Sequence, residues 1–236
     1  DLQLPRILLA GVQKSGSTAV ADFLHRAGVC LSRPNPAQDI EQKSVYYFDK
    51  NYDRGIDYYA SMFAHCNDKE GVGKKVGMDL ATDATPNNFR MAHRIRQTYD
   101  QVSSDQLEKL KIIVVVREPV ARELSWYNHL VSECIKHPNE QCKKKISNRD
   151  RKTSKKKRGR TDPTKNIKSF PEYAEYLFGD FMDGKPIPIE KRLPSSFYER
   201  YLTEWYEMFN PKQILFLNYS ELKQDERNFL KRIASF

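Results

Sequence analysis

The sequence predicts an α/β fold: three layers, in which a central, mostly parallel sheet is flanked by helices on both faces. Three apolar runs are the expected strands, at residues 7–10, 111–117 and 214–219. The second run, KIIVVVR, is a continuous β-branched stretch, which is typical of a central strand buried on both faces. Stretches with helical spacing of apolar residues separate these runs, and such alternation indicates parallel pairing of the strands.

Local patterns predict the remaining elements. Residues 17–27 form an apolar stripe that ends at Gly28, so a helix is expected there. The aromatic residues 45–48 are expected at the rim of the site that the first loop builds. A weaker strand is expected at 76–80, and residues 30–39, which include two prolines, are expected to be a loop. Further helices are predicted at residues 55–64, 87–99, 119–131, 170–178, 196–209 and 221–236.

One domain over residues 1–236 is the simplest division of the chain. The formal net charge of +9 is concentrated in residues 143–168, which hold thirteen Lys and Arg against two acids, so the rest of the chain carries a net −2. This basic segment lacks apolar periodicity and is expected to be a mobile insertion. Because the basicity is local, no general nucleic-acid-binding surface is expected.

Composition also bears on membranes, metals and compartment. No run approaches the roughly 18 apolar residues of a membrane span. The four cysteines, Cys30, Cys66, Cys134 and Cys142, lack the spacing of metal ligands, so no metal site is predicted. Cys134 and Cys142 are near enough in sequence to close a small loop in an oxidising compartment. An Asn-X-Ser sequon at residues 218–220 is compatible with a secretory location but is too short to establish it.

The loop after the first apolar run has the residues of an anion cradle. Gly11 and Gly16 bracket it, and hydroxyl residues open the next helix. A helix N-terminus after a glycine loop presents backbone N–H groups to an anion, and the helix dipole favours negative charge. The usual nucleotide-binding loop has lysine directly after the second glycine. Here Ser17 takes that place and the lysine is Lys14, so the loop is P-loop-like and is predicted to neutralise a leaving group rather than to hydrolyse ATP or GTP.

A second anion site is predicted at the end of the β-branched strand. Arg117 lies at its carboxyl end, where ligands bind in open α/β sheets. Ser125 and His129 are four residues apart on the following helix, so they share a face. A guanidinium and a hydroxyl together suit a phosphate. Two anion sites on neighbouring strand ends predict a ligand with phosphates at both ends, not a triphosphate.

These motifs carry a family resemblance. GVQKSGSTAV, followed by VVVREPVARELSWYNH, resembles the sulfotransferases that use 3′-phosphoadenosine 5′-phosphosulfate (PAPS). The chain is most similar to the Golgi glycosaminoglycan branch, which includes the heparan sulfate N- and 3-O-sulfotransferases. The segments YYFDKNYDRGIDYYASMF, DATPNNF and YLTEWYEMFNPKQILFLNYSEL extend the resemblance over nearly the whole chain, apart from the basic segment.

The resemblance implies transfer of the sulfuryl group of PAPS to a hydroxyl or amino group of a carbohydrate acceptor. Arg117 and Ser125 are then expected to hold the 3′-phosphate. His129 corresponds to a histidine near the reacting centre. Such transfer needs mainly positioning and charge stabilisation, with Lys14 at the bridging oxygen, so no metal is required. The residues expected at the 5′-phosphosulfate are Lys14, Ser15, Gly16, Ser17 and Thr18.

The same resemblance implies partners and a location. The expected partner is an anionic glycan that enters beside Tyr46, Tyr47 and Asp83, with no nucleic acid and an unknown oligomeric state. The Golgi lumen is the expected compartment, with a membrane anchor outside these 236 residues; a cytoplasmic location stays open. The chain ends at Phe236, before a lysine- and glycine-rich loop that closes over the nucleotide in the family. Either a truncated sequence or the replacement of this loop by another segment would explain why the chain ends at Phe236.

The general base departs from the family pattern. Ser44 stands where related enzymes have a glutamate, and serine cannot accept the acceptor's proton unaided. A Glu-Lys-Thr-Pro pattern becomes Asp-Ala-Thr-Pro at residues 83–86. The candidate bases are therefore Asp83 and His129, with Glu41 third.

Other interpretations are kept beside this one. A catalytically silent polyanion-binding protein on the same fold is the main alternative, and a P-loop nucleotide kinase is a further one. Lys14 in a plain strand–turn–helix corner would be merely solvated, and Asp83 in a structural role would cap the next helix. Arg122 in a structural role would pair with Glu118 or Glu123 on the helix surface. Four aromatic residues are expected to pack rather than to bind sugars: Trp126, Tyr127, Trp205 and Tyr206.

Overall fold

The structure is a computed structural model, and it describes the chain except residues 1, 34, 36–39, 68–76, 137–166 and 185–194. The described residues form two compact units. The first comprises residues 1–118 and 197–236, and the second comprises residues 119–196. No composition shift or linker pattern in the sequence marks this internal division.

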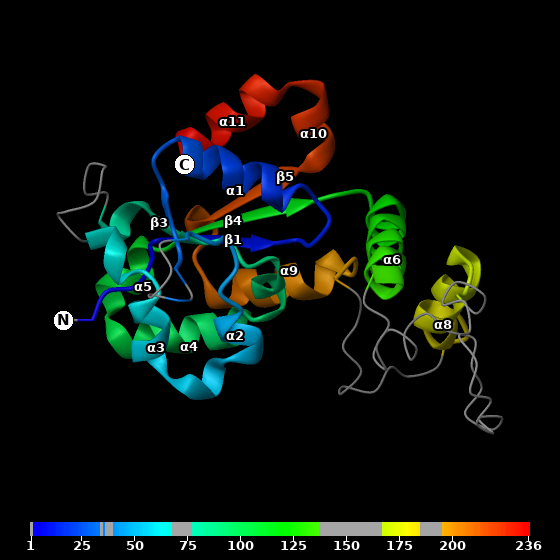
Figure 1. Ribbon diagram of the computed structural model, residues 1–236, viewed down its shortest axis with the longest axis horizontal. Coiled ribbons are helices and arrows are strands. Elements are labelled where there is room, and N and C mark those ends of the chain that lie inside the picture. The colour runs from blue at the N-terminus through cyan, green and yellow to red at the C-terminus, as the bar shows by residue number, and fades with distance from the viewer. Residues whose placement is uncertain (1, 34, 36–39, 68–76, 137–166, 185–194) are drawn as a thin grey trace. The chain divides into compact units, whose positions relative to one another are not determined.

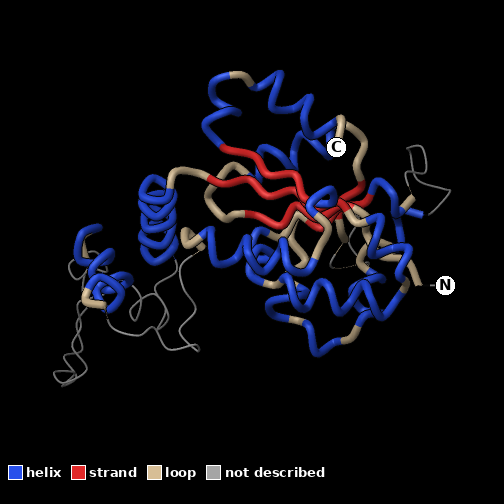
Figure 2. Tube along the Cα trace, turned by 180° about the vertical axis from the view of Figure 1, so that it is seen from behind, coloured by secondary structure: helices blue, strands red, loops and turns tan. Residues whose placement is uncertain are grey.

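The first unit is built on a five-stranded sheet in the order β2-β3-β1-β4-β5, in which every pair is parallel. Figure 2 draws the strands of this sheet in red. From β1 the chain passes to β2 and β3 on one side and later to β4 on the other. Such a reversal marks the place where ligands bind in open α/β sheets, at the carboxyl ends of the strands. The strands are β1 (Ile7–Gly11), β2 (Cys30–Leu31), β3 (Ala81–Asp83), β4 (Lys111–Val116) and β5 (Ile214–Asn218).

Helices cover both faces of this sheet, as the sequence predicts (Figure 1). One face carries α1 (Ser17–Arg26), α10 (Tyr219–Gln224) and α11 (Glu226–Ala234). The other carries α2 (Tyr47–Lys50), α3 (Ile56–Ser61), α4 (Ala92–Val102), α5 (Ser104–Lys109) and α9 (Tyr198–Met208).

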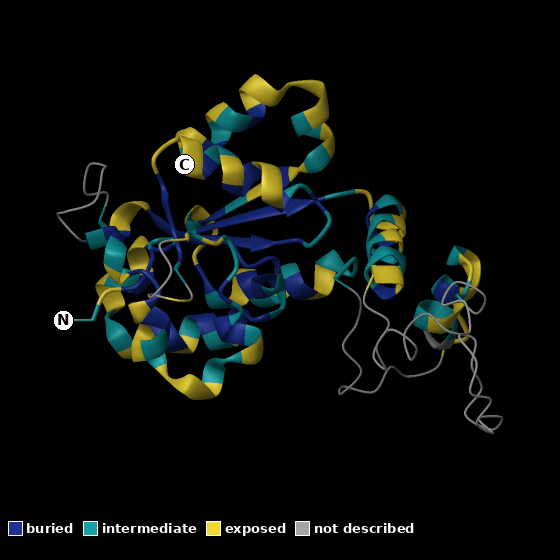
Figure 3. Cartoon of the chain, in the orientation of Figure 1, coloured by how far each residue is buried: buried dark blue, intermediate teal, exposed yellow. Residues whose placement is uncertain are grey.

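The strand side chains alternate between two cores, because successive residues of a strand point to opposite faces. Ile113 and Val115 pack in the core beneath α1 and α11, while Ile112 and Val114 pack in the larger core that contains Trp205. The central strands are buried along their length (Figure 3). Trp205 is fully buried and donates its indole N–H to the carbonyl of Phe89 at 2.9 Å, which confirms the packing role expected for it.

Three predictions about local structure in this unit are wrong. The strand expected at 76–80 begins later, as β3, and Met78–Leu80 is a 3₁₀ helix. The two-residue strand β2 lies within the expected loop, since its pairing depends on β3 rather than on a local pattern. The aromatic segment 45–48 is not at a rim: Tyr47 and Phe48 are buried, and Tyr47 stacks on Tyr59 with ring centroids 4.6 Å apart.

The second unit contains α6 (Pro119–Lys136) and α8 (Phe170–Met182), which pack through aromatic residues. The ring of Tyr127 lies 5.3 Å from that of Tyr173, and its hydroxyl donates to the carbonyl of Lys168 at 2.6 Å. Arg122 pairs with Glu123, but both side chains are buried rather than on the helix surface as expected.

Several predictions concern residues that the structure does not describe. Residues 143–166 of the basic segment lie outside the described part, and so does Cys142. Cys134 is disulfide-bonded. Within the described residues, none of the helices has the length and apolar character needed to span a bilayer.

Candidate active site

The loop between β1 and α1 is held in an unusual backbone conformation. Gly11 has φ 139°, and a Cβ there would lie 2.5 Å from the carbonyl oxygen of Pro86, so only glycine fits. Lys14 has φ 69°, a left-handed conformation that non-glycine residues rarely adopt and that often marks functional sites. The N–H of Ser15 donates to the carbonyl of Val12 at 3.1 Å and closes the turn. This backbone sets the direction in which the Cα–Cβ bond of Lys14 leaves the loop.

The N-terminus of α1 is open. Its N-cap, Gly16, has no side chain and so makes no capping hydrogen bond to the first N–H groups of the helix. Ser15 is fully buried, and its Oγ has no hydrogen-bond partner among the described residues. A buried hydroxyl without a partner costs free energy, and an anion oxygen at this helix N-terminus would remove that cost.

Gly16 lies against a residue from a distant part of the chain. A Cβ on Gly16 would stand 2.6 Å from Cδ2 of Tyr219, at the start of α10. The guanidinium of Arg117 lies over the same ring, 5.3 Å from its centroid. The sequence does not single out Tyr219 for the site, because only the parallel pairing of β4 and β5 brings it there.

The structure brings Lys14 and Arg117 together, as the sequence predicts. A guanidinium N–H of Arg117 donates to the carbonyl of Lys14 at 3.5 Å. Arg117 is anchored in turn, since its own carbonyl accepts a hydrogen bond from the Tyr198 hydroxyl at 2.7 Å. The two predicted anion-binding residues therefore meet at the carboxyl ends of neighbouring strands, β1 and β4.

A third cation lies at this site, and the sequence does not reveal it. The ammonium of Lys43 donates to Thr18 Oγ1, at the start of α1, at 2.6 Å. Burial lowers the pKa of Lys43; the carboxylate of Asp22 opposes this effect and the Lys14 ammonium adds to it. No local sequence pattern marks Lys43, because the contact with Thr18 that places it here joins residues 25 positions apart in the sequence.

Asp83 is at the centre of a buried network rather than in an open pocket. It is fully buried, and both of its carboxylate oxygens accept hydrogen bonds. One accepts from the N–H and hydroxyl of Thr85, and the other from the Tyr59 hydroxyl and the Asn88 amide. Desolvation raises the pKa of Asp83, and these four hydrogen bonds oppose the rise. The carboxylate of Asp83 and the side chain of Tyr47 are both buried in the structure, so the expected entry of an acceptor beside Tyr46, Tyr47 and Asp83 stays a prediction.

Thr85 links the Asp83 network to the backbone of residues 45 and 46, which follow Ser44. Its Oγ1 donates to Asp83 and accepts from the N–H of Val45 at 2.9 Å and of Tyr46 at 3.3 Å. Asp83 thus has a structural role at the turn before the next helix, and it also positions residues 45–46.

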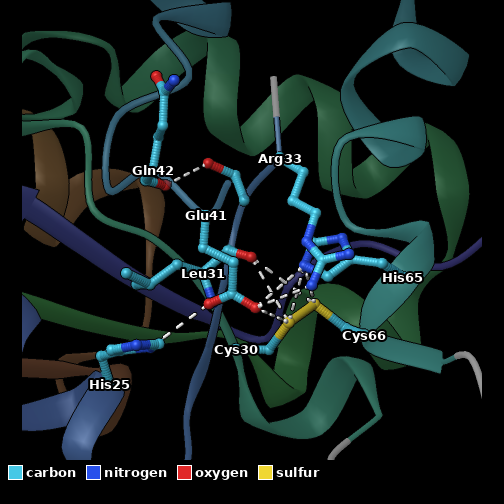
Figure 4. The surroundings of a disulfide bond; sticks show 9 residues. His25, Cys30, Leu31, Arg33, Glu41, Gln42, His65 and Cys66 are labelled. Carbon is cyan, nitrogen blue, oxygen red and sulfur yellow. Dashed lines mark hydrogen bonds and ion pairs between the residues drawn. A yellow bond between two sulfur atoms is a disulfide. The ribbon is translucent and has the colours of Figure 1, made fainter. Parts of the chain in front are cut away.

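Glu41 lies in a separate cluster around a disulfide (Figure 4). One carboxylate oxygen accepts from the N–H of Leu31 at 3.3 Å and lies 3.4 Å from His25 Nδ1, while the other lies 3.4 Å from His65 Nε2. A further ion pair joins it to Arg33 at 3.8 Å. These contacts give the Glu41 carboxylate a structural role beside β2.

The disulfide joins Cys30 and Cys66, with an S–S distance of 2.01 Å. His65 Nε2 is 3.2 Å from Cys30 Sγ, so two cysteines and a histidine cluster as metal ligands would. Zinc needs thiolates, and sulfur atoms bonded to each other are not thiolates. The cluster is therefore a disulfide with polar neighbours, a pairing that the sequence does not predict.

Ser125 and His129 lie on α6, in the second unit. They are one helical turn apart, and the His129 ring lies 5.4 Å from the ring of Trp126. Their contact with the ligand at Lys14 stays a prediction.

The described residues fit a nucleotide with phosphates at two positions. The open start of α1, the unpartnered Ser15 hydroxyl and the cations Lys14 and Lys43 suit one anionic group. Arg117, supported by Tyr219, supplies a guanidinium for the other.

The chain is similar in sequence to known sulfotransferases. A human bifunctional heparan sulfate N-deacetylase/N-sulfotransferase 3 is 25% identical over 99% of the chain, which covers 22% of that protein. The human heparan sulfate glucosamine 3-O-sulfotransferase 3B1 is 23% identical over 99% of the chain, which covers 46% of that protein. The chain thus spans less than half the length of these relatives.

The fold has a counterpart among solved structures. A sulfotransferase from Alicyclobacillus acidocaldarius superposes with a TM-score of 0.56 over 98% of this chain and 79% of that one, at 15% identity. The family model for the sulfotransferase domain matches residues 4–236. Because that match includes nearly every residue, the chain belongs to the sulfotransferase family.

Proposed function

We propose that this protein transfers the sulfuryl group of PAPS to a hydroxyl or amino group of a glycosaminoglycan-like carbohydrate. The observation that carries the proposal is the meeting of Arg117 and Lys14 beside the open N-terminus of α1. One nucleotide with a 3′-phosphate and a 5′-phosphosulfate satisfies both cationic groups. Family membership supports the reaction, and the heparan sulfate names of the relatives support the acceptor class.

The reaction breaks the bond between sulfur and the bridging phosphate oxygen, and it forms a bond from sulfur to the acceptor oxygen or nitrogen, which loses a proton. Lys14 neutralises the charge that the bridging oxygen gains. The N–H groups at the start of α1 and the Ser15 hydroxyl hold the 5′ group, and Arg117 holds the 3′-phosphate, with Ser125 as its second predicted partner. No step needs a redox partner, because the sulfuryl group moves without a change in oxidation state.

The acceptor's proton goes to His129 in this proposal. Asp83 is buried with both oxygens occupied, and Glu41 is held by the cluster at the disulfide. His129 is then the remaining candidate of the three that the sequence offers. It lies in the second unit, so its approach to the acceptor is part of the proposal.

A secretory compartment, the Golgi lumen by family analogy, is proposed as the location. Two observations support it. The Cys30–Cys66 disulfide favours an oxidising compartment. Asn218 of the sequon is exposed, although its Oδ1 accepts from the N–H of Ser220 at 3.0 Å.

The test is a screen of acceptors with radiolabelled PAPS and the full-length protein. N-desulfated heparin and fully N-sulfated heparan sulfate separate N- from O-sulfation, because only the first offers free amino groups. We expect incorporation of label into at least one of them. Binding of heparin without transfer to any glycan would favour the silent polyanion-binding alternative, for which Ser44 in place of a glutamate is the supporting observation. Tighter binding of ATP than of PAPS would favour a kinase.

A further inference from the structure

Lys43 stands at the donor site without an assigned role. Its ammonium is 2.6 Å from Thr18 Oγ1, in the first turn of α1, and the positive charge of Lys14 contributes to lowering the pKa of Lys43. Two like charges held together at a helix N-terminus are unfavourable in an empty protein, because the positive end of the helix dipole repels both. An anion bound between them attracts both ammonium groups and the positive end of the helix dipole, and these attractions offset the repulsion.

The backbone of Lys43 is fixed independently of its side chain. Its carbonyl accepts the N–H of Ala84 at 2.9 Å, directly after β3, and the following residues are held by Thr85. Ala84 is the position at which the Glu-Lys-Thr-Pro pattern has its lysine. Ala84 does not supply the positive charge of that lysine. Lys43, on the segment hydrogen-bonded to Ala84, supplies a positive charge instead.

The ammonium retains donors for a ligand. An ammonium has three N–H donors, and the bond to Thr18 uses one of them. Among the charged groups that act on it, Lys14 is a cation and Asp22, one turn further along α1, is an acid. Thr18 is predicted to face the 5′ group of the donor, whereas Arg117 faces the 3′-phosphate, so Lys43 belongs to the 5′ end.

We propose that Lys43 is a donor-binding residue whose ammonium holds oxygens of the 5′-phosphosulfate together with Lys14. This inference rests on the proposed function. It assigns the sulfotransferase site a second lysine, from the segment before α2, in addition to the lysine of the loop. The charge of the ammonium, rather than its bond to Thr18, carries the role.

The test compares three variants of the full chain by calorimetric titration. Lys43→Met removes the charge and keeps the aliphatic stem, Lys43→Arg keeps a charge, and Lys231→Met makes the same change at an exposed site on α11. The probes are 3′-phosphoadenosine 5′-phosphate and adenosine 3′-phosphate, which lacks the 5′ group. We expect Lys43→Met to weaken binding of the bisphosphate about tenfold or more, as loss of a charge-assisted hydrogen bond does. Binding of adenosine 3′-phosphate should change less than twofold.

The outcomes separate this inference from the function on which it rests. Recovery of most of the affinity in Lys43→Arg, with no change in Lys231→Met, would support it. Bisphosphate binding by Lys43→Met within twofold of wild type would overturn the role of Lys43 alone. Equal losses for both probes would also overturn it, because they indicate a distorted site. If the wild-type protein binds neither probe, the donor site itself is refuted, and the inference with it.

Discussion

The ring of Tyr219 fills the space in which a side chain at Gly16 would lie. A Cβ on Gly16 would be 2.6 Å from Cδ2 and 2.7 Å from Cε2 of that ring. The loop after β1 therefore packs directly on the residue that follows β5, and the Arg117 guanidinium lies over the same ring. One aromatic side chain supports both halves of the proposed donor site.

Gly16→Ala should disrupt this contact. Gly28 provides a matched control, because it has a similar φ (92° against 89°) at the other end of α1, where a Cβ would have nothing within 4 Å. Gly28→Ala should cost about 1 kcal/mol through backbone strain alone. Gly16→Ala should cost more and abolish binding of 3′-phosphoadenosine 5′-phosphate, as measured by thermal unfolding and calorimetry. Equal effects of the two substitutions would mean that the contact with Tyr219 does not matter.

Lys14→Met should lower kcat by about 100-fold or more, because charge on the leaving oxygen is no longer neutralised. The unfolding temperature should not fall, since the Lys14 side chain is not part of either core. Steady-state sulfation with labelled PAPS measures the effect, and Lys231→Met is the control for loss of a lysine charge. Turnover at the wild-type rate in Lys14→Met would refute the role assigned to this lysine.

Asp83→Asn separates a structural carboxylate from a catalytic one. Asparagine keeps the shape, and the Asn88 Oδ1, which has no partner among the described residues, can accept its amide after a flip of the Asn88 side chain. Sulfation should therefore persist in Asp83→Asn. Asp83→Ala should lower stability by about 3 kcal/mol, because it leaves several buried donors unpaired. A loss of kcat above 100-fold in a stable Asp83→Asn protein would instead identify Asp83 as the base.

Asp83 also makes the free energy of unfolding depend on pH. The folded pKa of Asp83 is raised above 3.8, so the folded state binds its proton more tightly than the unfolded state. The stabilisation that protonated Asp83 provides is complete at pH values below its pKa in the unfolded state. It declines as the pH rises through its pKa in the folded state. Across this acidic window, the free energy of unfolding of Asp83→Asn should therefore rise relative to that of wild type as pH increases. Urea titrations at several pH values measure the difference; an opposite slope would contradict the assigned direction.

His129→Gln tests the proposed base. It should lower kcat by about 10²- to 10⁴-fold and remove the fall in rate at acidic pH that protonation of a histidine base causes. Ser125→Ala, on the same face of α6, should instead weaken binding of the 3′-phosphate and leave the pH profile of kcat intact. A His129→Gln enzyme that keeps the wild-type profile would exclude this histidine.

The Cys30–Cys66 disulfide should contribute about 3–4 kcal/mol to stability, given the sequence separation of 36 between its cysteines. Reduction should therefore lower the unfolding temperature of the wild-type protein. A Cys30→Ser/Cys66→Ser double variant should unfold at that lower temperature with or without reductant. If reductant lowers the unfolding temperature of the double variant equally, the effect belongs to the other disulfide, at Cys134.

The strands and loop predicted from sequence are those whose signal is local. The apolar runs of β1, β4 and β5 are recognisable because strands covered on both faces need apolar residues throughout. Gly11, Lys14 and Gly16 are recognisable because backbone at positive φ and an open helix N-terminus need particular residues at fixed spacing. Because Arg117 directly follows the β4 strand, the sequence also placed it at the same edge of the sheet.

The rest was decided by contacts between distant segments. Neither Tyr219 nor Lys43 carries a local signal; each reaches the loop because the sheet order and the β3 segment bring it there. The candidate bases show the same limit, since the sequence offered Asp83 and Glu41 as candidate bases and the fold holds both in networks of hydrogen bonds and ion pairs. Sequence alone determined the family resemblance and the loop from Gly11 to Gly16 on which the proposed donor site depends. Which side chains lie around that loop depends on burial and on partners far along the chain, and only the tertiary structure fixes those.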